Sequence, residues 1–578
     1  MTTTRTKQGK RAPGNMVRVW SGRFALVLAP FVLLGLAEAL MRWVDPAPVD
    51  PRWKDPYIRP LVDDEGEAVR DSQGRALLSN EPMTAHWAGD NVGQRSFAAE
   101  RRDGVARVFS IGASTTFALK YAPRASYTRF LSARLSERLG EGAVEVVNLG
   151  ISGYDSVDLP RLTRELLEYE PDLLIVYAGH NELKYPNLAR VLDPTATAVA
   201  ETMRRSALLW RLLEEPPEPA VPPELTSEPL LDPDRFARSL EFYSEALLTI
   251  VESARAQGVE VLLCVPASNV RDKLPRQSAL PVDGEAALRR RLEQLKELLH
   301  PERELPTEVA VLDAGLVEAE ALCQEAPEAS LAHYLRGRLL FALRRTEEAR
   351  SAFERSRELD RLPERAWPAL TRELREVAAR TGAVLVDVEA RIHSEAEGGT
   401  PGFDLFFDYC HPNLRGHWCI ADELLAVIQR EELLGDAKLL GAPESETTFE
   451  QWCERFGVDE SMGTIQQARQ FLGFAALREG DERERLLAVV EEFLNAVLRD
   501  PASESPIRAE AWTLQAIVAV MRGRHDRSVD SLRRAGELDE SVRRGVLLRM
   551  VRNAFFRDRF EALGLFVEPD GRWREESP

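Results

Sequence analysis

Four short polar segments stand out in this sequence, because each contains residue types that can take part in acyl transfer. They are Gly112-Ala113-Ser114-Thr115-Thr116, Asn148-Leu149-Gly150-Ile151-Ser152-Gly153-Tyr154, Gly179-His180-Asn181-Glu182 and Asp408-Tyr409-Cys410-His411-Pro412-Asn413. A serine hydroxyl is a weak nucleophile at neutral pH, so it needs an adjacent base and a third group that orients that base. Ser114, His411 and Asp408 can fill these three roles, and the sequence therefore predicts a catalytic serine.

The same segments also contain candidate hydrogen-bond donors. The intermediate of acyl attack carries a negatively charged oxygen, which needs donors that are fixed in advance. The backbone N–H groups of Ser114 and Gly153 and the side-chain amide of Asn181 can supply three of them. A glycine at position 153 lets the backbone approach a substrate, because it has no Cβ.

The elements that must position these segments form a regular pattern. Short apolar runs alternate with helical segments and predict five strands, at Arg107–Ile111, Val144–Val147, Leu173–Tyr177, Val259–Val265 and Ala383–Asp387. Helices such as Arg129–Leu139 and Leu159–Tyr169 lie between strands, which indicates a parallel sheet covered on both faces. Ligands of such sheets bind at the carboxyl ends of the strands. Because the four polar segments follow strand ends, we expect them to meet at one edge of the sheet.

In this order the four segments resemble those of the SGNH (GDSL-type) hydrolase superfamily, over about Arg107 to Gln429. The resemblance implies a three-layer, flavodoxin-like α/β fold and hydrolysis of an ester without a cofactor. It assigns the catalytic roles to Ser114, Asp408 and His411, and the oxyanion hole to Ser114, Gly153 and Asn181. Two positions depart from the usual pattern. The superfamily commonly has aspartate at the positions of Ala113, in the first segment, and Glu182, in the third.

Other residues near the strand ends are weaker candidates. His180 could bind substrate or be a structural histidine. Asn269 and Arg271 follow the fourth strand, and Arg271 could contact an anion or pair with a nearby acid. Cys410 is not expected to act with His411, because adjacent side chains on an extended segment point to opposite faces. No paired carboxylates, metal-ligand cluster or P-loop is present in the sequence, so neither a metal nor a cofactor is predicted.

The first forty residues carry a membrane signal. Between Met1 and Arg23 there are six basic residues and no acidic one, and an apolar run from Phe24 to Ala37 follows, extended to Met41 by Glu38-Ala39-Leu40-Met41. The stretch Phe24–Met41 is at the short end of what spans a bilayer, and the positive-inside rule places the rest of the chain on the far side. We expect a single-pass anchor in the inner (cytoplasmic) membrane, with the remainder periplasmic or extracytoplasmic. Ala37-Glu38-Ala39 leaves open a cleaved signal peptide.

Two helical regions flank or interrupt the sheet pattern. A block at about 285–368 contains a segment with the small-residue spacing of a tetratricopeptide repeat, and the region from Trp452 to Phe566 contains similar spacing. The expected organisation is a basic segment (1–23), an anchor (24–41), a linker (42–104), a hydrolase domain (105–434, with the helical insert at about 285–368) and a C-terminal all-α repeat-like domain (445–570). The Pro- and Glu-rich stretch Glu214–Pro233 is expected to be a solvated loop or lid.

Composition limits the remaining possibilities. The 578 residues carry a net charge of -19, which argues against nucleic-acid binding because that requires a basic footprint. Five irregularly spaced cysteines indicate neither a disulfide framework nor a zinc site. The predicted function is an exported, membrane-anchored serine esterase acting on an ester-bearing small molecule or a glycan. An O-acyltransferase that modifies a cell-envelope glycan, and a non-catalytic scaffold whose repeats bind a protein, remain alternatives.

Overall fold

The central element of the protein is a parallel β-sheet. The computed structural model describes residues 57–62, 67–80, 95–118, 121, 125–182, 233–281, 284–299, 306–434, 446–476, 478–500, 503–552 and 554–575. The strands are β4 (Ala106–Gly112), β5 (Val144–Asn148), β6 (Leu173–Tyr177), β7 (Glu260–Cys264) and β8 (Val384–Val386). They pair in the order β5-β4-β6-β7-β8, and every pairing is parallel. This arrangement confirms the predicted five-stranded α/β fold.

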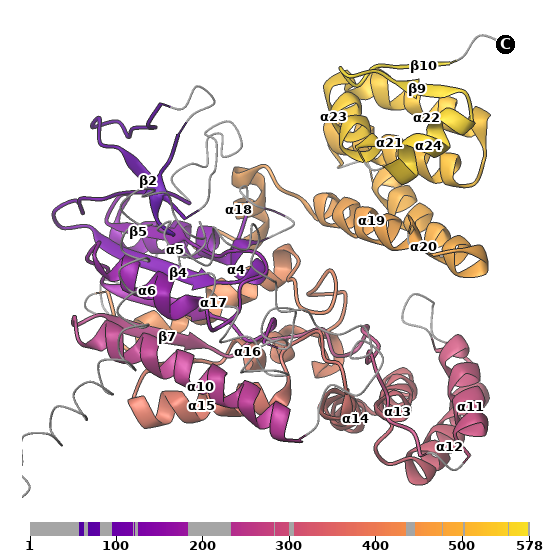
Figure 1. Cartoon of the computed structure of the whole chain (residues 1–578), viewed down its shortest axis with the longest axis horizontal. Coiled ribbons are helices and arrows are strands. Elements are labelled where there is room, and N and C mark those ends of the chain that lie inside the picture. The colour runs from indigo at the N-terminus through magenta and orange to yellow at the C-terminus, as the bar shows by residue number, and fades with distance from the viewer. Residues whose placement is uncertain are drawn as a thin grey trace, which may run out of the picture. The chain divides into compact units, whose positions relative to one another are not determined.

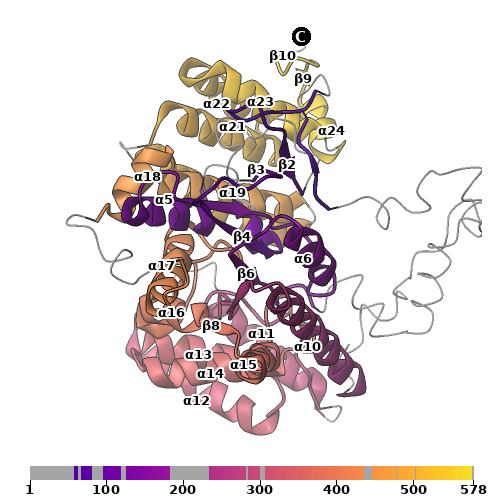
Figure 2. The ribbon, with the colours of Figure 1, turned by 90° about the vertical axis from the view of Figure 1, so that its left-hand side faces the viewer.

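Helices cover both faces of this sheet (Figures 1 and 2). One face packs against α5 (Tyr127–Leu139) and α17 (Leu414–Arg430), and the other against α6 (Leu159–Leu167), α10 (Pro233–Arg255) and α15 (Pro368–Thr381). Successive residues of β4 alternate between the two cores, with Val108 in one and Phe109 in the other. Strands that are apolar on both faces are typical of a buried parallel sheet.

The segment before the sheet is not an extended linker, so the prediction for residues 42–104 is wrong in its described part. β1 (Arg59–Pro60), β2 (Leu77–Ser79) and β3 (Phe97–Ala98) form a small antiparallel sheet. Ile58 and Phe97 are buried in the same core as α6. The strands are too short to show a sequence period, and these apolar anchors explain why the segment is nevertheless ordered.

A helical insert separates β7 from β8. It contains α11 (Glu285–Leu298), α12 (Val309–Glu325), α13 (Ser330–Ala342) and α14 (Thr346–Leu359). α13 and α14 pack closely, because a Cβ at Gly337 would lie 2.8 Å from the Phe353 ring. The helix α16 (Val388–Glu395) and the turn η3 (Glu397–Gly399) then lead to the fourth polar segment.

The C-terminal region is helical, with one exception. Its helices are α18 (Phe449–Phe456), α19 (Glu460–Ala476), α20 (Gly480–Arg499), α21 (Ser505–Met521), α22 (His525–Leu538), α23 (Glu540–Val551) and α24 (Ala554–Ala562). Beyond them β9 (Leu565–Val567) and β10 (Trp573–Glu575) pair antiparallel, although no strand was predicted after Leu434. Gly564 and Gly571 both adopt positive φ and allow the chain to leave α24 and turn between these strands.

None of the helices within the described ranges is long and apolar enough to cross a membrane. The predicted anchor, Phe24–Met41, lies outside the described residues, as does most of the predicted loop Glu214–Pro233.

Candidate active site

The carboxyl end of β4 leads directly into Ser114, the first residue of the short helix α4 (Ser114–Phe117). The backbone is crowded here, because a Cβ at Gly112 would lie 2.2 Å from the carbonyl oxygen of Tyr177 at the end of β6. A Cβ at Gly150 would lie 2.4 Å from the backbone nitrogen of Phe117. These two glycines therefore allow the first and second polar segments to pack against each other.

The fourth polar segment lies against Ser114, although 297 residues separate Ser114 from His411. The Nε2 atom of His411 lies 2.7 Å from the Oγ atom of Ser114. On the other side of the ring, Nδ1 lies 2.7 Å and 3.0 Å from the two carboxylate oxygens of Asp408. All three residues are buried. The structure thus brings the predicted serine, histidine and aspartate into one hydrogen-bonded chain.

Asp408 and His411 each stabilise the charged form of the other. Burial alone would raise the pKa of Asp408, but the charge of His411 and its hydrogen bond, with the backbone N–H groups of Cys410 and His411, lower it well below its usual value. Burial lowers the pKa of His411, whereas neighbouring Cys410 and Asp408 outweigh burial and raise it to about 10. The pair therefore favours an imidazolium beside a carboxylate.

The loops that carry the predicted oxyanion donors are tied to one another. The backbone N–H of Ile151 donates to the carbonyl oxygen of Gly112 over 3.0 Å. The side-chain amide of Asn181 donates to the carbonyl oxygen of Tyr154 over 2.7 Å, next to Gly153. Gly153 has a φ of 85°, in the left-handed region that favours glycine. The three loops with Ser114, Gly153 and Asn181 thus lie at the same edge of the sheet.

A carboxyl group to which the sequence assigned no role joins two of these loops. Glu182 is buried, and its Oε2 atom accepts the hydroxyl of Ser156 over 2.5 Å. The backbone N–H of Ser156 donates to the same oxygen over 3.3 Å. Burial, and then the charge of Asp155, raise the pKa of Glu182 to about 8. Its position directly after Asn181 was the available signal. Its partner, however, lies 26 residues away along the chain and could not be identified from spacing.

Asn148 is a second residue whose role the sequence did not indicate. Its side-chain amide donates to the carbonyl oxygen of Thr116 over 2.6 Å and to the hydroxyl of Thr128 over 3.1 Å. Its side-chain oxygen accepts the backbone N–H of Gly150. One buried amide therefore fixes the helix that begins at Ser114 relative to the second polar segment.

Two of the three predicted substrate-binding residues, His180 and Asn269, accept hydrogen bonds from backbone N–H groups inside the protein. The Nδ1 atom of His180 accepts the backbone N–H of Ala366 over 3.1 Å, and the residue is buried. Asn269 is fully buried, and its side-chain oxygen accepts the backbone N–H of Asp272 over 2.9 Å. Both side chains hold the segments that enter and leave the insert.

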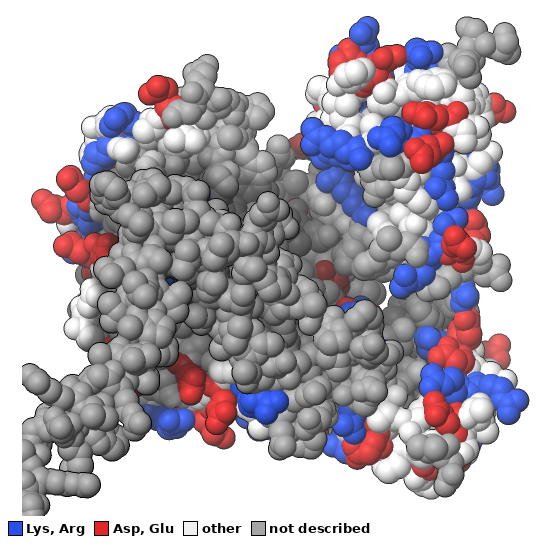
Figure 3. All heavy atoms as spheres, in the orientation of Figure 1, with Lys and Arg blue, Asp and Glu red and all other residues white. Residues whose placement is uncertain are grey.

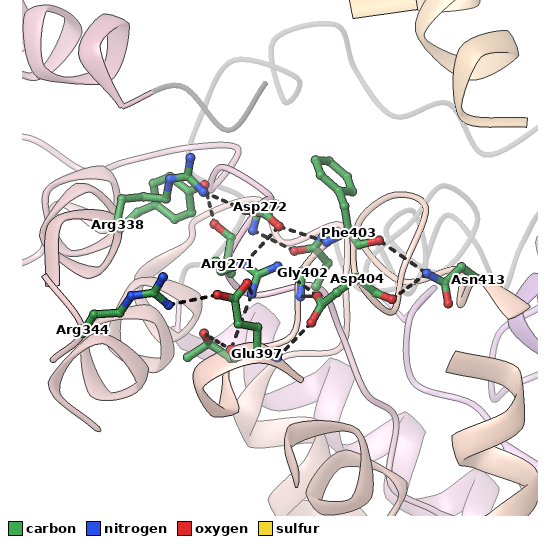
Figure 4. Close-up of polar contacts among 12 residues, drawn as sticks. Arg271, Asp272, Arg338, Arg344, Glu397, Gly402, Phe403, Asp404 and Asn413 are labelled. Atoms are coloured by element: carbon green, nitrogen blue, oxygen red, sulfur yellow. Dashed lines mark hydrogen bonds and ion pairs between the residues drawn. The ribbon is translucent and has the colours of Figure 1, made fainter. Parts of the chain in front are cut away.

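Arg271, the third, lies in a network of ion pairs (Figure 4). Its guanidinium contacts Asp272 at 3.1 Å and Asp404 at 3.0 Å, so the structure shows the ion-pair alternative rather than an anion site. Asp272 also pairs with Arg338 of α13 at 2.7 Å. Asp404 accepts the backbone N–H of Gly402, and its carbonyl oxygen accepts the side-chain amide of Asn413. The network thus joins the insert to the loop that carries Asp408 and His411.

Cys410 does not point away from His411, so the expectation of opposite faces is wrong. Its Sγ atom lies 3.9 Å from Nδ1 of His411. The reason is that the segment is a turn, in which the carboxylate of Asp408 accepts the backbone N–H groups of both Cys410 and His411. The serine, however, lies on the Nε2 side of the ring. Cys410 is therefore on the wrong side to compete as a nucleophile.

Asp408, Cys410 and His411 are also the one group of three potential metal ligands found within the described ranges. The Nδ1 atom that a metal would need already forms the hydrogen bond to Asp408. The arrangement fits an acid–base pair, and the polar contacts of the site are those of a serine, a base and an acid.

Part of the chain is similar to known proteins. Residues 110–328, less than half of the chain, match the GDSL-like Lipase/Acylhydrolase family. Similar solved structures include LAE5, an alpha/beta hydrolase from the metagenome of Lake Arreo, Spain, at 17% identity, covering 57% of this chain and 97% of that chain with a TM-score of 0.27. Another is Axe2, an acetylxylan esterase from Geobacillus stearothermophilus, at 14% identity, covering 57% of this chain and 96% of that chain with a TM-score of 0.27. None of the curated proteins matches the sequence.

The family match begins within β4, four residues before Ser114, and includes the first three polar segments. The fourth segment lies outside the match, but its His411 forms a hydrogen bond to Ser114. Residues 110–328 are thus similar to GDSL-like lipases and acylhydrolases, and the protein is a carboxylic ester hydrolase.

Proposed function

We propose that the protein hydrolyses an acyl ester through a covalent acyl-enzyme on Ser114. The observation that carries this proposal is the hydrogen-bonded chain from the Ser114 hydroxyl through the ring of His411 to the carboxylate of Asp408. In that chain Nε2 is positioned to take the serine proton, while Asp408 holds Nδ1–H and fixes the tautomer.

The reaction proceeds in two balanced halves. The oxygen of Ser114 attacks the acyl carbon, His411 takes its proton, and the same proton then passes to the leaving alcohol. A water molecule next gives a proton to His411 and attacks the acyl carbon, and the carboxylic acid leaves as the serine regains its proton. The backbone N–H groups of Ser114 and Gly153 and the amide of Asn181 stabilise the negative oxygen in both halves.

Hydrolysis of p-nitrophenyl acetate by the full chain tests this proposal. Ser114→Ala and His411→Ala are each expected to lower kcat/KM by about 10⁴-fold, because the triad acts as a unit. Ser136→Ala is the control, since the Ser136 hydroxyl only donates to the carbonyl oxygen of Ser132 within α5. Release of free acetic acid, rather than a new ester on an added glycan, distinguishes hydrolysis from acyl transfer. Unchanged activity in Ser114→Ala would contradict the proposal.

We propose further that the chain is exported and remains anchored by Phe24–Met41 in the cytoplasmic membrane. The support is the basic segment before the apolar run, with six basic and no acidic residues up to Arg23. A membrane anchor would restrict the hydrolase to esters in the cell envelope, whether on small molecules or on glycans.

A further inference from the structure

The C-terminal helices contain a groove that plays no part in the proposed chemistry. It lies between α20, α21 and α22 and has a volume of about 360 Å³. Four arginines line it, namely Arg522, Arg524, Arg527 and Arg534, together with the ring of Trp512. Because all of these residues belong to three consecutive helices or to the turn between two of them, the groove is complete within this region.

The four arginines differ in how their charges are compensated. Arg522 has little exposed surface and pairs with Glu484 and with Glu491, the latter at 2.6 Å. Arg534 pairs with Asp530 at 2.9 Å and lies 4.8 Å from the centre of the Trp512 ring. Arg524 and Arg527 are exposed, and neither side chain forms a hydrogen bond or ion pair with any residue in the described part of the chain. The groove therefore carries uncompensated positive charge.

The positive charge of the groove is opposite in sign to the net charge of the chain. The protein has 94 acidic and 75 basic residues, and Figure 3 shows acidic side chains beside basic ones over the C-terminal helices. A long polyanion such as RNA, or an anionic membrane surface, would extend beyond the groove and meet this negative charge. A short acidic ligand would experience mainly the local arginines, since charges are screened beyond about 8 Å at physiological ionic strength.

Two further lining residues, Glu491 and Asp530, are the carboxylates that pair with Arg522 and Arg534, and several of the others are suited to an extended peptide. Trp512 is half-buried and offers an aromatic surface beside the cation of Arg534. Asn495 and Gln515 also line the groove, and the side-chain amide of Gln515 donates to the side-chain oxygen of Asn495 over 3.1 Å. The remaining N–H groups of the two amides and the side-chain oxygen of Gln515 can form hydrogen bonds with a peptide backbone. The volume accommodates a few side chains but no folded domain.

We propose that this groove binds a short acidic segment of a partner protein in an extended conformation. Carboxylates of the segment pair with Arg524 and Arg527, and an apolar side chain next to them packs on Trp512. Guanidinium groups suit this role because they bind carboxylates through two parallel hydrogen bonds. Such a contact would hold the hydrolase beside the partner without involving the active site.

Fluorescence anisotropy with the full chain tests the proposal. The probe is a fluorescein-labelled eight-residue peptide with four glutamates and two leucines, and its neutral counterpart has glutamine at the four positions. We expect saturable binding of the acidic peptide that weakens as salt is raised, and at least about tenfold weaker binding of the neutral peptide.

Matched variants locate the site. Arg524→Glu with Arg527→Glu is expected to weaken binding of the acidic peptide at least about tenfold, and Ser114→Ala is expected to leave it unchanged. Arg557→Glu is the control, because Arg557 is exposed on α24 and does not line the groove. Circular dichroism checks that each variant is folded. Absence of binding, equal binding by the double variant, or tighter binding of a single-stranded RNA or of phosphatidylglycerol vesicles at the same arginines would overturn the proposal.

Discussion

His411 must be neutral to accept the proton of Ser114, yet its surroundings favour the charged ring. The carboxylate of Asp408 lies 2.7 Å from Nδ1, and Cys410 lies next to the same atom. These neighbours raise the pKa of His411 from its ordinary 6.5 to about 10. In the enzyme without substrate, the fraction with a neutral base therefore increases as the pH rises towards that value.

The first prediction follows from this pKa. The value of kcat/KM for p-nitrophenyl acetate should increase with pH along a limb that lies well above pH 6.5, because only neutral His411 is active. Asp408→Asn should move this limb to lower pH, since it removes an attracting charge, and should lower the maximal rate by about 10⁴-fold. Stopped-flow assays from pH 5 to 10.5 measure both effects.

Cys410→Ala provides the control for that experiment. It removes one group that raises the pKa of His411 but leaves the hydrogen bond to Asp408 in place. The limb should move to lower pH, while the maximal rate stays within about threefold of the wild-type rate because the triad is intact. A limb at pH 6.5 in the wild type would contradict this description of the base.

The carboxyl group of Glu182 is a second group whose ionisation should affect activity, at alkaline pH. It joins Ser156 to the loop with Asn181, and the groups around it are Asp155 and Asp158 before α6, and Ser239 and Tyr243 of α10. With a pKa raised to about 8, Glu182 is uncharged at neutral pH. Above pH 8 it becomes a carboxylate beside Asp155, and the repulsion should loosen the loop that carries Gly153.

The second prediction concerns substitutions at Glu182. Above about pH 8, wild-type kcat should drop progressively below that of Glu182→Gln, because the amide is neutral and can still bond to Ser156, whereas the neutral fraction of His411 rises in both proteins. Glu182→Ala should lose about tenfold in kcat at all pH values, since it removes a buried hydrogen bond to the loop. Identical dependence of kcat on pH above pH 8 in wild type and Glu182→Gln would exclude this role.

At the scale of elements, the insert braces the loop that carries Asp408 and His411. The buried pair between Arg338 of α13 and Asp272 is the central contact (Figure 4). Gly402 allows the two segments to approach, because a Cβ there would lie 2.1 Å from an oxygen of Asp272. The position of His411, the proposed base, thus depends on a helix of the insert.

The third prediction is that Arg338→Met destabilises the fold and slows catalysis. Removing one partner of a buried ion pair costs about 3 to 5 kcal/mol, although Arg271 still compensates part of the charge of Asp272. Urea unfolding should show a clear loss of stability, and kcat should fall about tenfold with KM little changed. Arg344→Met is the control, because Arg344 is 76% exposed and its pair with Glu397 should contribute less than about 1 kcal/mol. Equal effects of the two variants would refute the bracing role.

The sequence predicted the bounds of those strands whose structure is determined by a local apolar pattern. The strands Leu173–Tyr177 and Val144–Asn148 lie at or within one residue of their predicted bounds, because buried parallel strands are continuous apolar runs. Spacing could not reveal the pair of Glu182 and Ser156 or the orientation of Cys410. These depend on how loops fold onto one another, and Cys410 depends on a turn held by Asp408. The small strands Leu565–Val567 and Trp573–Glu575 are too short to differ in pattern from the helices before them.

At the scale of the whole molecule, the described part contains everything that the proposed reaction needs. The backbone N–H of Tyr57 donates to a carboxylate oxygen of Glu165, and the segment that follows packs on the sheet domain. Ser114, Asp408 and His411 all lie in that domain, whereas the proposed anchor ends at Met41, 16 positions before Tyr57.

The fourth prediction is that anchoring and catalysis can be separated. A chain that begins at Val44 should hydrolyse p-nitrophenyl acetate with a kcat within about twofold of the full chain, because the triad and both cores are retained. The full chain should sediment with membranes after cell lysis, and the shortened chain should not. If expression of the full chain gives a product in the supernatant whose N-terminus lies near Ala39, the segment is a cleaved signal peptide instead.

Labelling with a fluorophosphonate probe tests the central claim most directly, because the probe reacts only with a serine whose proton has a nearby acceptor. Intact-mass and peptide spectrometry of the folded wild type should show one adduct, on Ser114. His411→Ala and Ser114→Ala should show none. A folded wild type that stays unlabelled, or that carries the adduct on another residue, would contradict a nucleophile activated by His411.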